Sequence, residues 1–75
     1  MKKIRDEKLM ADFGSHVRKL RMAQGLSMEK LAELAEIEYS QISKIERGLV
    51  NTTISSSNAL AKGLNIELHT LFNFK

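Results

Sequence analysis

Five polar side chains lie close together in the middle of this chain and could bind another molecule. They are Tyr39, Ser40, Gln41, Ser43 and Lys44. Hydroxyl and amide groups donate and accept hydrogen bonds, and a lysine ammonium donates three. Ile42 and Ile45 recur among them at helical spacing, so the polar groups would occupy the outer face of a helix. A helix with such a face could contact the edges of DNA bases.

Two short helices joined by a tight corner would position these side chains. The first is predicted at residues 28–35 and the second at residues 39–47, which leaves only residues 36–38 between them. The inward positions are apolar or small: Leu31, Ala32, Ala35, Ile37, Ile42 and Ile45. Small residues let two crossing helices approach closely. The segment therefore has the pattern of a helix-turn-helix.

Three further helices are predicted around this pair, at residues 6–24, 54–64 and 67–72. The long first helix has an apolar face that consists of Leu9, Phe13, Val17 and Leu20. The inward positions of the fourth helix would be Ile54, Ser57, Leu60 or Ala61, and Leu64. Gly14 costs the first helix ~1 kcal/mol relative to alanine, so we expect a close contact with another helix there. The fold class is all-α.

Capping residues support these limits. Ser27 and Thr53 are suitable N-caps, whereas Glu38 is a poor one. Gly25 and Gly48 are expected to end the first and third helices in the left-handed conformation, and Asn65 is expected to end the fourth in the same way.

Length and charge limit the other possibilities. The 75 residues form one domain, predicted at residues 6–75, preceded by a flexible basic arm at residues 1–5. Residues 1–21 contain seven basic and three acidic side chains, whereas residues 22–48 contain three basic and five acidic ones. A basic excess suits a polyanionic partner. No apolar segment is long enough to span a membrane, so the expected location is the cytoplasm, in association with the nucleoid.

No catalytic or metal-binding pattern is present in the sequence. There is no cysteine, and the two histidines, His16 and His69, are far apart. No serine has a base and an orienting acid at a suitable spacing, and no glycine-rich phosphate loop occurs. The sequence therefore predicts no enzyme, no metal and no cofactor.

Several of these blocks together resemble the lambda-repressor-like or Xre family of bacterial and phage regulators. The matching residues extend from about residue 13 to residue 72 and include Phe13-Gly14, Leu20-Arg21, Gly25-Leu26-Ser27, Leu31-Ala32, the run from Ile42 to Gly48, Leu60-Ala61-Lys62, Glu67-Leu68 and Leu71-Phe72. The resemblance implies a DNA-binding domain of five helices, with the helix-turn-helix at the second and third, that binds operators as a dimer.

The resemblance also implies roles for individual residues. The third helix would enter the major groove with Tyr39, Ser40 and Lys44 at base edges, and with Gln41 and Ser43 at the border of the contact. Ser27, Arg47 and Asn51 would contact phosphates on either side. Arg21 and Glu46 would form a partly buried ion pair between the first and third helices. Leu68, Leu71, Phe72 and Phe74 would form the dimer interface.

Three positions depart from the family pattern. Met28 stands where the family usually has a glutamine that contacts a phosphate or a base-reading side chain, so Met28 is not a predicted contact. Glu36 stands where the family often has glycine in the corner, and it would be strained in a left-handed conformation. Ser57 stands where leucine is common.

Two classes of function are consistent with this sequence. The first is a sequence-specific transcriptional regulator that binds double-stranded DNA as a homodimer on a palindromic operator, and a restriction-modification controller would be one form of it. The second is an antitoxin or anti-regulator that binds a protein partner such as a toxin, with DNA binding secondary. The five acidic residues between residues 22 and 48 give the second class some support.

Overall fold

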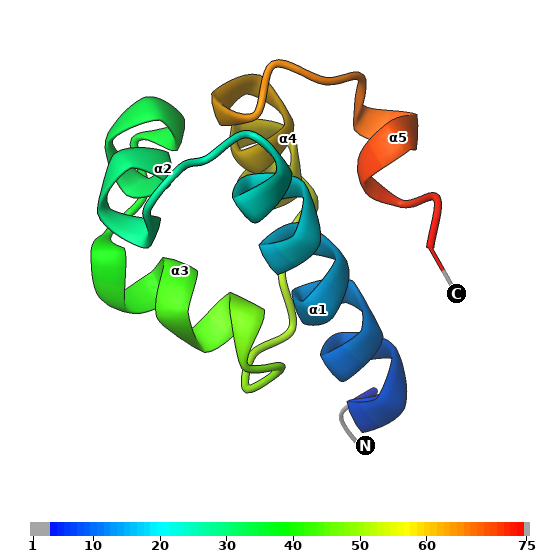
Figure 1. Ribbon diagram of the computed structural model, residues 1–75. Helices are drawn as coiled ribbons and strands as arrows, with labels where there is room; N and C mark the ends of the chain where they lie inside the picture. The colour runs from blue at the N-terminus through cyan, green and yellow to red at the C-terminus, as the bar shows by residue number, and fades with distance from the viewer. Residues whose placement is uncertain (1–3, 75) are drawn as a thin grey trace.

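Five helices form most of the described part of the chain, residues 4–74, in this computed structural model (Figure 1). They are α1 (Glu7–Ala23), α2 (Met28–Ala35), α3 (Tyr39–Glu46), α4 (Ile54–Gly63) and α5 (Leu68–Leu71). No strand occurs between residues 4 and 74. The predicted all-α class is therefore confirmed, and every helix lies within two residues of its predicted limits.

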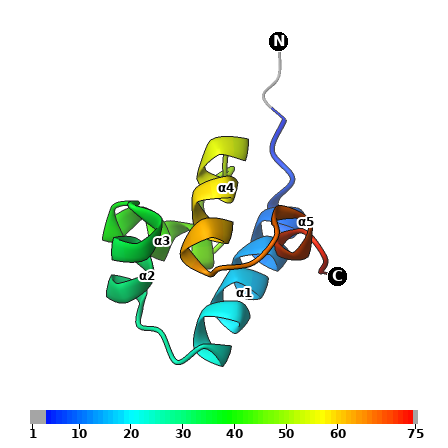
Figure 2. The same ribbon diagram turned by 90° about the horizontal axis from the view of Figure 1, so that it is seen from above.

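The helices pack in pairs. α2 packs against α4, α3 packs against α1, and α2 and α3 also contact each other (Figure 2). The short α5 packs against α4 on the side away from α2 and α3. The helix-turn-helix is thus supported from behind by the long α1 and by α4.

The core lies where these helices meet. Its buried members are Phe13, Val17, Leu31, Ala32, Ala35, Ile42, Ile45, Leu60, Ala61, Leu64 and Leu71. Each of the larger side chains among them, the phenylalanine, valine, leucines and isoleucines, contributes about 1.5–3 kcal/mol relative to the exposed state. The predicted inward positions of α2 and α3 are all buried except Ile37, which is partly buried and packs against this core.

Two predicted inward positions are wrong. Leu9 is 53% exposed and Ile54 is 79% exposed. Leu9 lies in the first turn of α1 and Ile54 is the first residue of α4, and in each of these turns a different residue is buried. In α1 the neighbouring Met10 is buried instead.

Side-chain caps begin three of the helices. The Ser27 hydroxyl accepts a hydrogen bond from the backbone N–H of Lys30 (3.0 Å), as predicted for α2, and Thr53 caps α4 in the same way. Asp6 was predicted in the first turn of α1 but is its N-cap, and its carboxylate accepts from the Leu9 N–H at 3.0 Å. Glu38 makes no capping hydrogen bond at α3, as its residue type suggests.

The backbone is left-handed at the predicted positions. Gly25 and Gly48 have φ values of 69° and 71°. Glu36 and Asn65 both have φ = 57°, so the corner between α2 and α3 holds a glutamate in a conformation that suits glycine better. Asn65 tolerates the same conformation more easily because its short side chain can bond locally.

Gly14 allows α1 and α3 to make the close contact predicted for it. A Cβ atom at this position would overlap the backbone carbonyl oxygen of Ile45 and would lie 2.8 Å from that of Glu46. The end of α3 therefore rests directly on the α1 backbone.

Candidate nucleic-acid interface

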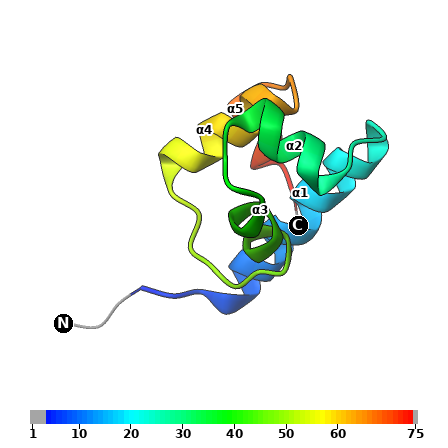
Figure 3. The ribbon, with the colours of Figure 1, turned by 90° about the vertical axis from the view of Figure 1, so that its left-hand side faces the viewer.

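The outer face of α3 presents polar side chains to solvent. Tyr39 is 49% exposed, Ser40 and Lys44 are exposed, and Gln41 and Ser43 are partly exposed. The opposite face of the helix is anchored in the core. Figure 3 shows α3 nearly end-on beside α2. The structure thus places all five predicted base-contacting side chains on one helix, at the surface of the helix-turn-helix.

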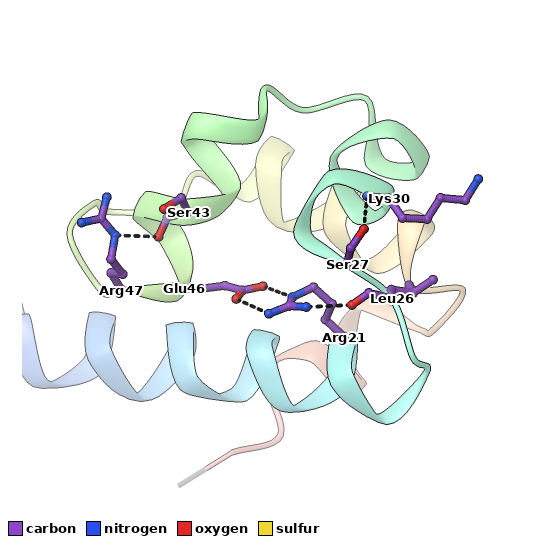
Figure 4. Close-up of polar contacts among 7 residues, drawn as sticks. All are labelled: Arg21, Leu26, Ser27, Lys30, Ser43, Glu46 and Arg47. Carbon is purple, nitrogen blue, oxygen red and sulfur yellow. Dashed lines mark hydrogen bonds and ion pairs between the residues drawn. The ribbon is translucent and has the colours of Figure 1, made fainter.

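Ser27 lies at the exposed N-terminus of α2. Its hydroxyl oxygen accepts the capping hydrogen bond from Lys30, so its own O–H remains free to donate (Figure 4). The free backbone N–H groups of a helix N-terminus and the positive end of its dipole favour an anion. This geometry suits the predicted phosphate contact.

Arg47 and Asn51 lie after α3, and the structure gives them different surroundings. Arg47 is exposed, and its Nε donates to the Ser43 carbonyl oxygen at 3.4 Å, which leaves most of the guanidinium accessible (Figure 4). Asn51 is also exposed, but its Nδ2 donates to the Ile4 carbonyl oxygen at 3.0 Å. The Asn51 side chain, which is predicted to bind phosphate, is thus already hydrogen-bonded to Ile4.

Arg21 and Glu46 form an ion pair between α1 and α3. Arg21 Nε lies 2.7 Å from Glu46 Oε2, and Arg21 Nη2 lies 3.0 Å from Oε1, in a bidentate arrangement (Figure 4). The two side chains are only 11% and 4% exposed. The hydrogen bond to Glu46 raises the pKa of Arg21 above its ordinary value, so this side chain stays charged.

The same guanidinium has a third partner that the sequence pattern did not reveal. Arg21 Nη1 donates to the Leu26 carbonyl oxygen at 2.7 Å, just before α2 (Figure 4). One side chain of α1 therefore fixes the position of α3 and the entry to α2. A main-chain acceptor has no residue-type signal, which is why sequence reasoning missed it.

The predicted dimer residues do not share one environment. Leu71 has an exposed fraction of 0% and belongs to the core, so it is removed from the predicted interface. Leu68 and Phe74 are partly buried against the core. Phe72 is 48% exposed, and its ring stacks on Phe13 with centroids 5.7 Å apart. Phe72 presents the largest apolar surface of these four residues.

The residues between 4 and 74 contain no group of three His, Cys, Asp or Glu side chains that could hold a metal ion. His16 is a structural residue, because its Nε2 lies 3.2 Å from the Thr70 carbonyl oxygen and its ring lies beside Phe74. None of the helices in this part of the chain is long and apolar enough to cross a membrane.

A helix-turn-helix with a polar outer face on its second helix defines a class of DNA-binding domains. The sequence model described as "Helix-turn-helix" matches residues 17–71, which is most of the chain. The chain belongs to this family, the lambda-repressor-like or Xre group of DNA-binding regulators.

Two curated relatives match most of this chain. The control protein C.BamHI of Bacillus amyloliquefaciens is 33% identical over 63 residues, which cover 83% of this chain and 78% of that protein. The transcriptional regulator SinR of Bacillus licheniformis is 35% identical over 63 residues, which cover 83% of this chain. The chain spans 57% of the length of SinR.

Solved structures of restriction-modification controller proteins have the same fold. C.AhdI from Aeromonas hydrophila is 40% identical, with a TM-score of 0.81, and the match covers 87% of this chain and 97% of that chain. C.Esp1396I, solved as a tetramer in complex with its natural 35 base-pair operator, is 30% identical with a TM-score of 0.83. That match covers 89% of this chain and 88% of that chain.

Proposed function

We propose that this protein is a sequence-specific transcriptional regulator that binds double-stranded DNA as a homodimer. The observation that carries the proposal is the exposed polar face of α3 on a helix-turn-helix whose inner side packs into the core, in a chain of the lambda-repressor-like family. The structure of C.Esp1396I with its operator supports it, because that protein is similar along 89% of this chain.

In this proposal α3 enters the major groove and reads the bases. Lys44 suits the acceptor atoms of guanine, and Ser40 and Gln41 can donate or accept. Ser27 and Arg47 contact phosphates on either side, which fixes the register of the helix without reading sequence. Two copies of α3 would lie about 34 Å apart, one turn of DNA, so the operator would be roughly palindromic.

The dimer is proposed to form through the C-terminal segment, with Leu68, Phe72 and Phe74 at its centre. Phe72 supports this proposal because it exposes an aromatic surface at the end of α5. Aromatic residues with exposed apolar surface are typical of the centres of protein interfaces.

A restriction-modification system is the proposed setting. C.BamHI is a control protein, and C.AhdI and C.Esp1396I are described as restriction-modification controllers. This favours a regulator over an antitoxin whose main task is to bind a toxin. Genes for a nuclease and a methyltransferase beside this one would support the setting, whereas a toxin gene there would favour the antitoxin.

In this proposal the protein is not an enzyme and uses no cofactor. It would act in the cytoplasm, in association with the nucleoid, where its operator lies. Its activity would be controlled by its own abundance or by another protein.

Selection of binding sites from random DNA tests the sequence-specific function. We expect one enriched, roughly palindromic motif. Lys44→Ala and Ser40→Ala should each weaken binding to that motif by roughly tenfold, about 1.4 kcal/mol, because base contacts are lost. Lys62→Ala is the matched control, since Lys62 is an exposed lysine on α4 and should leave binding unchanged. The absence of an enriched motif would contradict the proposal.

Arg47→Ala tests the phosphate contacts separately from base reading. It should weaken binding to all DNA sequences by a similar factor and reduce the slope of log affinity against log salt concentration by about one unit. An unchanged slope would remove Arg47 from the interface.

A further inference from the structure

Residues 4 and 5, here called the N-terminal segment, are hydrogen-bonded to the loop that follows α3, whereas residues 1–3 of the predicted basic arm lie outside the described residues. Asn51 Nδ2 donates to the Ile4 carbonyl oxygen at 3.0 Å, and Arg5 Nη2 donates to the Leu49 carbonyl oxygen at 3.4 Å. Asn51 and Ile4 are 47 positions apart in the sequence, and Arg5 and Leu49 are 44 positions apart. Gly48 closes the same junction, because a Cβ atom there would lie 2.7 Å from the Ala11 Cα of α1. Segment, loop and α1 thus form one unit.

Arg5 keeps donors free at this junction. Its side chain is 48% exposed, and its Nε lies 3.4 Å from the Glu7 carboxylate, which is itself 78% exposed. A guanidinium has five N–H donors, and within residues 4–74 no hydrogen bond is formed by Arg5 Nη1. An exposed ion pair of this kind contributes little to stability, because water screens both charges. An incoming phosphate can therefore replace Glu7 as a partner.

The position of Arg5 places it beside the proposed phosphate contacts. Leu49, whose carbonyl oxygen it reaches, lies two residues after Arg47 and two residues before Asn51. A duplex held by Arg47 would pass close to the Arg5 guanidinium.

The negative charge around the helix-turn-helix opposes the approach of DNA, which is also negatively charged. Four exposed glutamates, Glu29, Glu33, Glu36 and Glu38, lie on α2 and around its corner with α3. The phosphates of the duplex and these carboxylates are all negatively charged, so they repel each other. A cation supplied from outside the helix-turn-helix would offset part of this repulsion.

We infer that Arg5 is a phosphate-contacting residue and that Asn51 is a positioning residue for it. Asn51 holds the Ile4 main chain and thereby keeps Arg5 beside the loop, instead of contacting the phosphate through its own amide. The inference rests on the proposed DNA-binding function, because it requires the end of α3 to face the duplex.

Binding measured over a series of salt concentrations tests the inference, with wild type, Arg5→Ala, Asn51→Ala and the double variant. The salt slope should fall by about one unit in each single variant, since both lose the same phosphate contact. The double variant should also lose about one unit, and operator and random DNA should weaken by the same factor. Arg5→Lys should keep the slope, because it retains a cation. Lys62→Ala serves as the control for the removal of any surface charge.

Two results would overturn the inference. An unchanged slope in Arg5→Ala would show that Arg5 touches no phosphate. An unchanged slope in Asn51→Ala would show that Asn51 does not position Arg5, because a neutral amide contributes nothing of its own to the slope. Wild type that binds no DNA at all would instead refute the proposed function. Thermal unfolding of each variant by circular dichroism, with an unchanged midpoint expected at these exposed positions, separates a lost contact from a lost fold.

Discussion

At the scale of single residues, the Arg21 guanidinium connects three segments of the chain. It binds both carboxylate oxygens of Glu46 on α3 and the Leu26 carbonyl oxygen before α2. With 4% of its side chain exposed, Glu46 has almost no water to replace a missing partner. The two helices that are proposed to contact DNA are therefore oriented by one residue outside them.

Removal of Arg21 should be costly because it leaves a buried carboxylate without a counterion. We expect Arg21→Ala to lower the free energy of unfolding by about 3–5 kcal/mol, measured by urea denaturation. Lys8→Ala is the matched control: the Lys8–Asp12 ion pair is exposed, with Lys8 84% accessible, and its loss should lower the free energy of unfolding far less than the loss of Arg21 does. Equal losses in the two variants would mean that the buried pair stabilises the fold no more than the exposed pair does. Arg21→Lys, which keeps the charge but not the bidentate fork, should be intermediate.

Glu36 is strained at the corner between α2 and α3, and its replacement should stabilise the protein. Its φ of 57° costs a residue with a Cβ atom roughly 1–2 kcal/mol, which glycine avoids. We expect Glu36→Gly to raise the thermal midpoint by several degrees, corresponding to about 1 kcal/mol. Asn65 has the same φ of 57°, but Asn65→Gly should raise the thermal midpoint less, because asparagine tolerates the left-handed conformation better than glutamate does. A larger gain at Asn65 would contradict this explanation.

At the scale of elements, the contact between α1 and α3 depends on the absence of a side chain. Gly14 lies in the middle of α1, where glycine weakens a helix, yet the α3 carbonyl oxygens of Ile45 and Glu46 occupy the space of its missing Cβ. Main-chain atoms of a helix cannot move aside as a flexible side chain can.

Gly14→Ala should therefore destabilise the fold despite the better helix propensity of alanine. The gain of ~1 kcal/mol in propensity is outweighed by an overpacking cost of about 1–3 kcal/mol or more, since the clash is with backbone. Ser15→Ala, at the exposed neighbouring position, should change stability by less than about 0.5 kcal/mol. Chemical denaturation compares the two, and a Gly14→Ala protein more stable than wild type would exclude the close contact.

At the scale of the whole molecule, the described helices leave an apolar surface near the C-terminus. Phe72 and Leu9 are each about half exposed, and both border a pocket of about 130 Å³ that is also lined by Phe13, Phe74 and Ser57. The pocket lies next to Ser57, where the related family commonly has leucine. A small domain gains stability by covering such a surface with a second copy.

A charged side chain in this surface should separate the proposed dimer. We expect Phe72→Glu to sediment as a monomer at micromolar concentration, where wild type is expected to be a dimer. Leu34→Glu, at a similarly exposed leucine of α2 (46%), should remain dimeric. Wild type that is already monomeric at this concentration would rule out the C-terminal interface.

The sequence by itself determined the helices, the N-caps of α2 and α4, and the groups on the outer face of α3. Periodic apolar residues and local caps such as Ser27 and Thr53 involve neighbours within a few positions, so the local pattern is sufficient to predict them. The Arg21–Glu46 pair needed the family resemblance as well, because 25 residues separate its members.

Only the tertiary structure decided which positions the packed helices cover and which distant segments meet. It exposed Leu9 and Ile54, placed Leu71 in the core, and joined Asn51 to Ile4 across 47 residues. These features depend on where one helix ends relative to another and on main-chain acceptors, which every residue has. Residue type therefore carries no signal for them, and they follow from the packing of α1, α3 and the loop after α3.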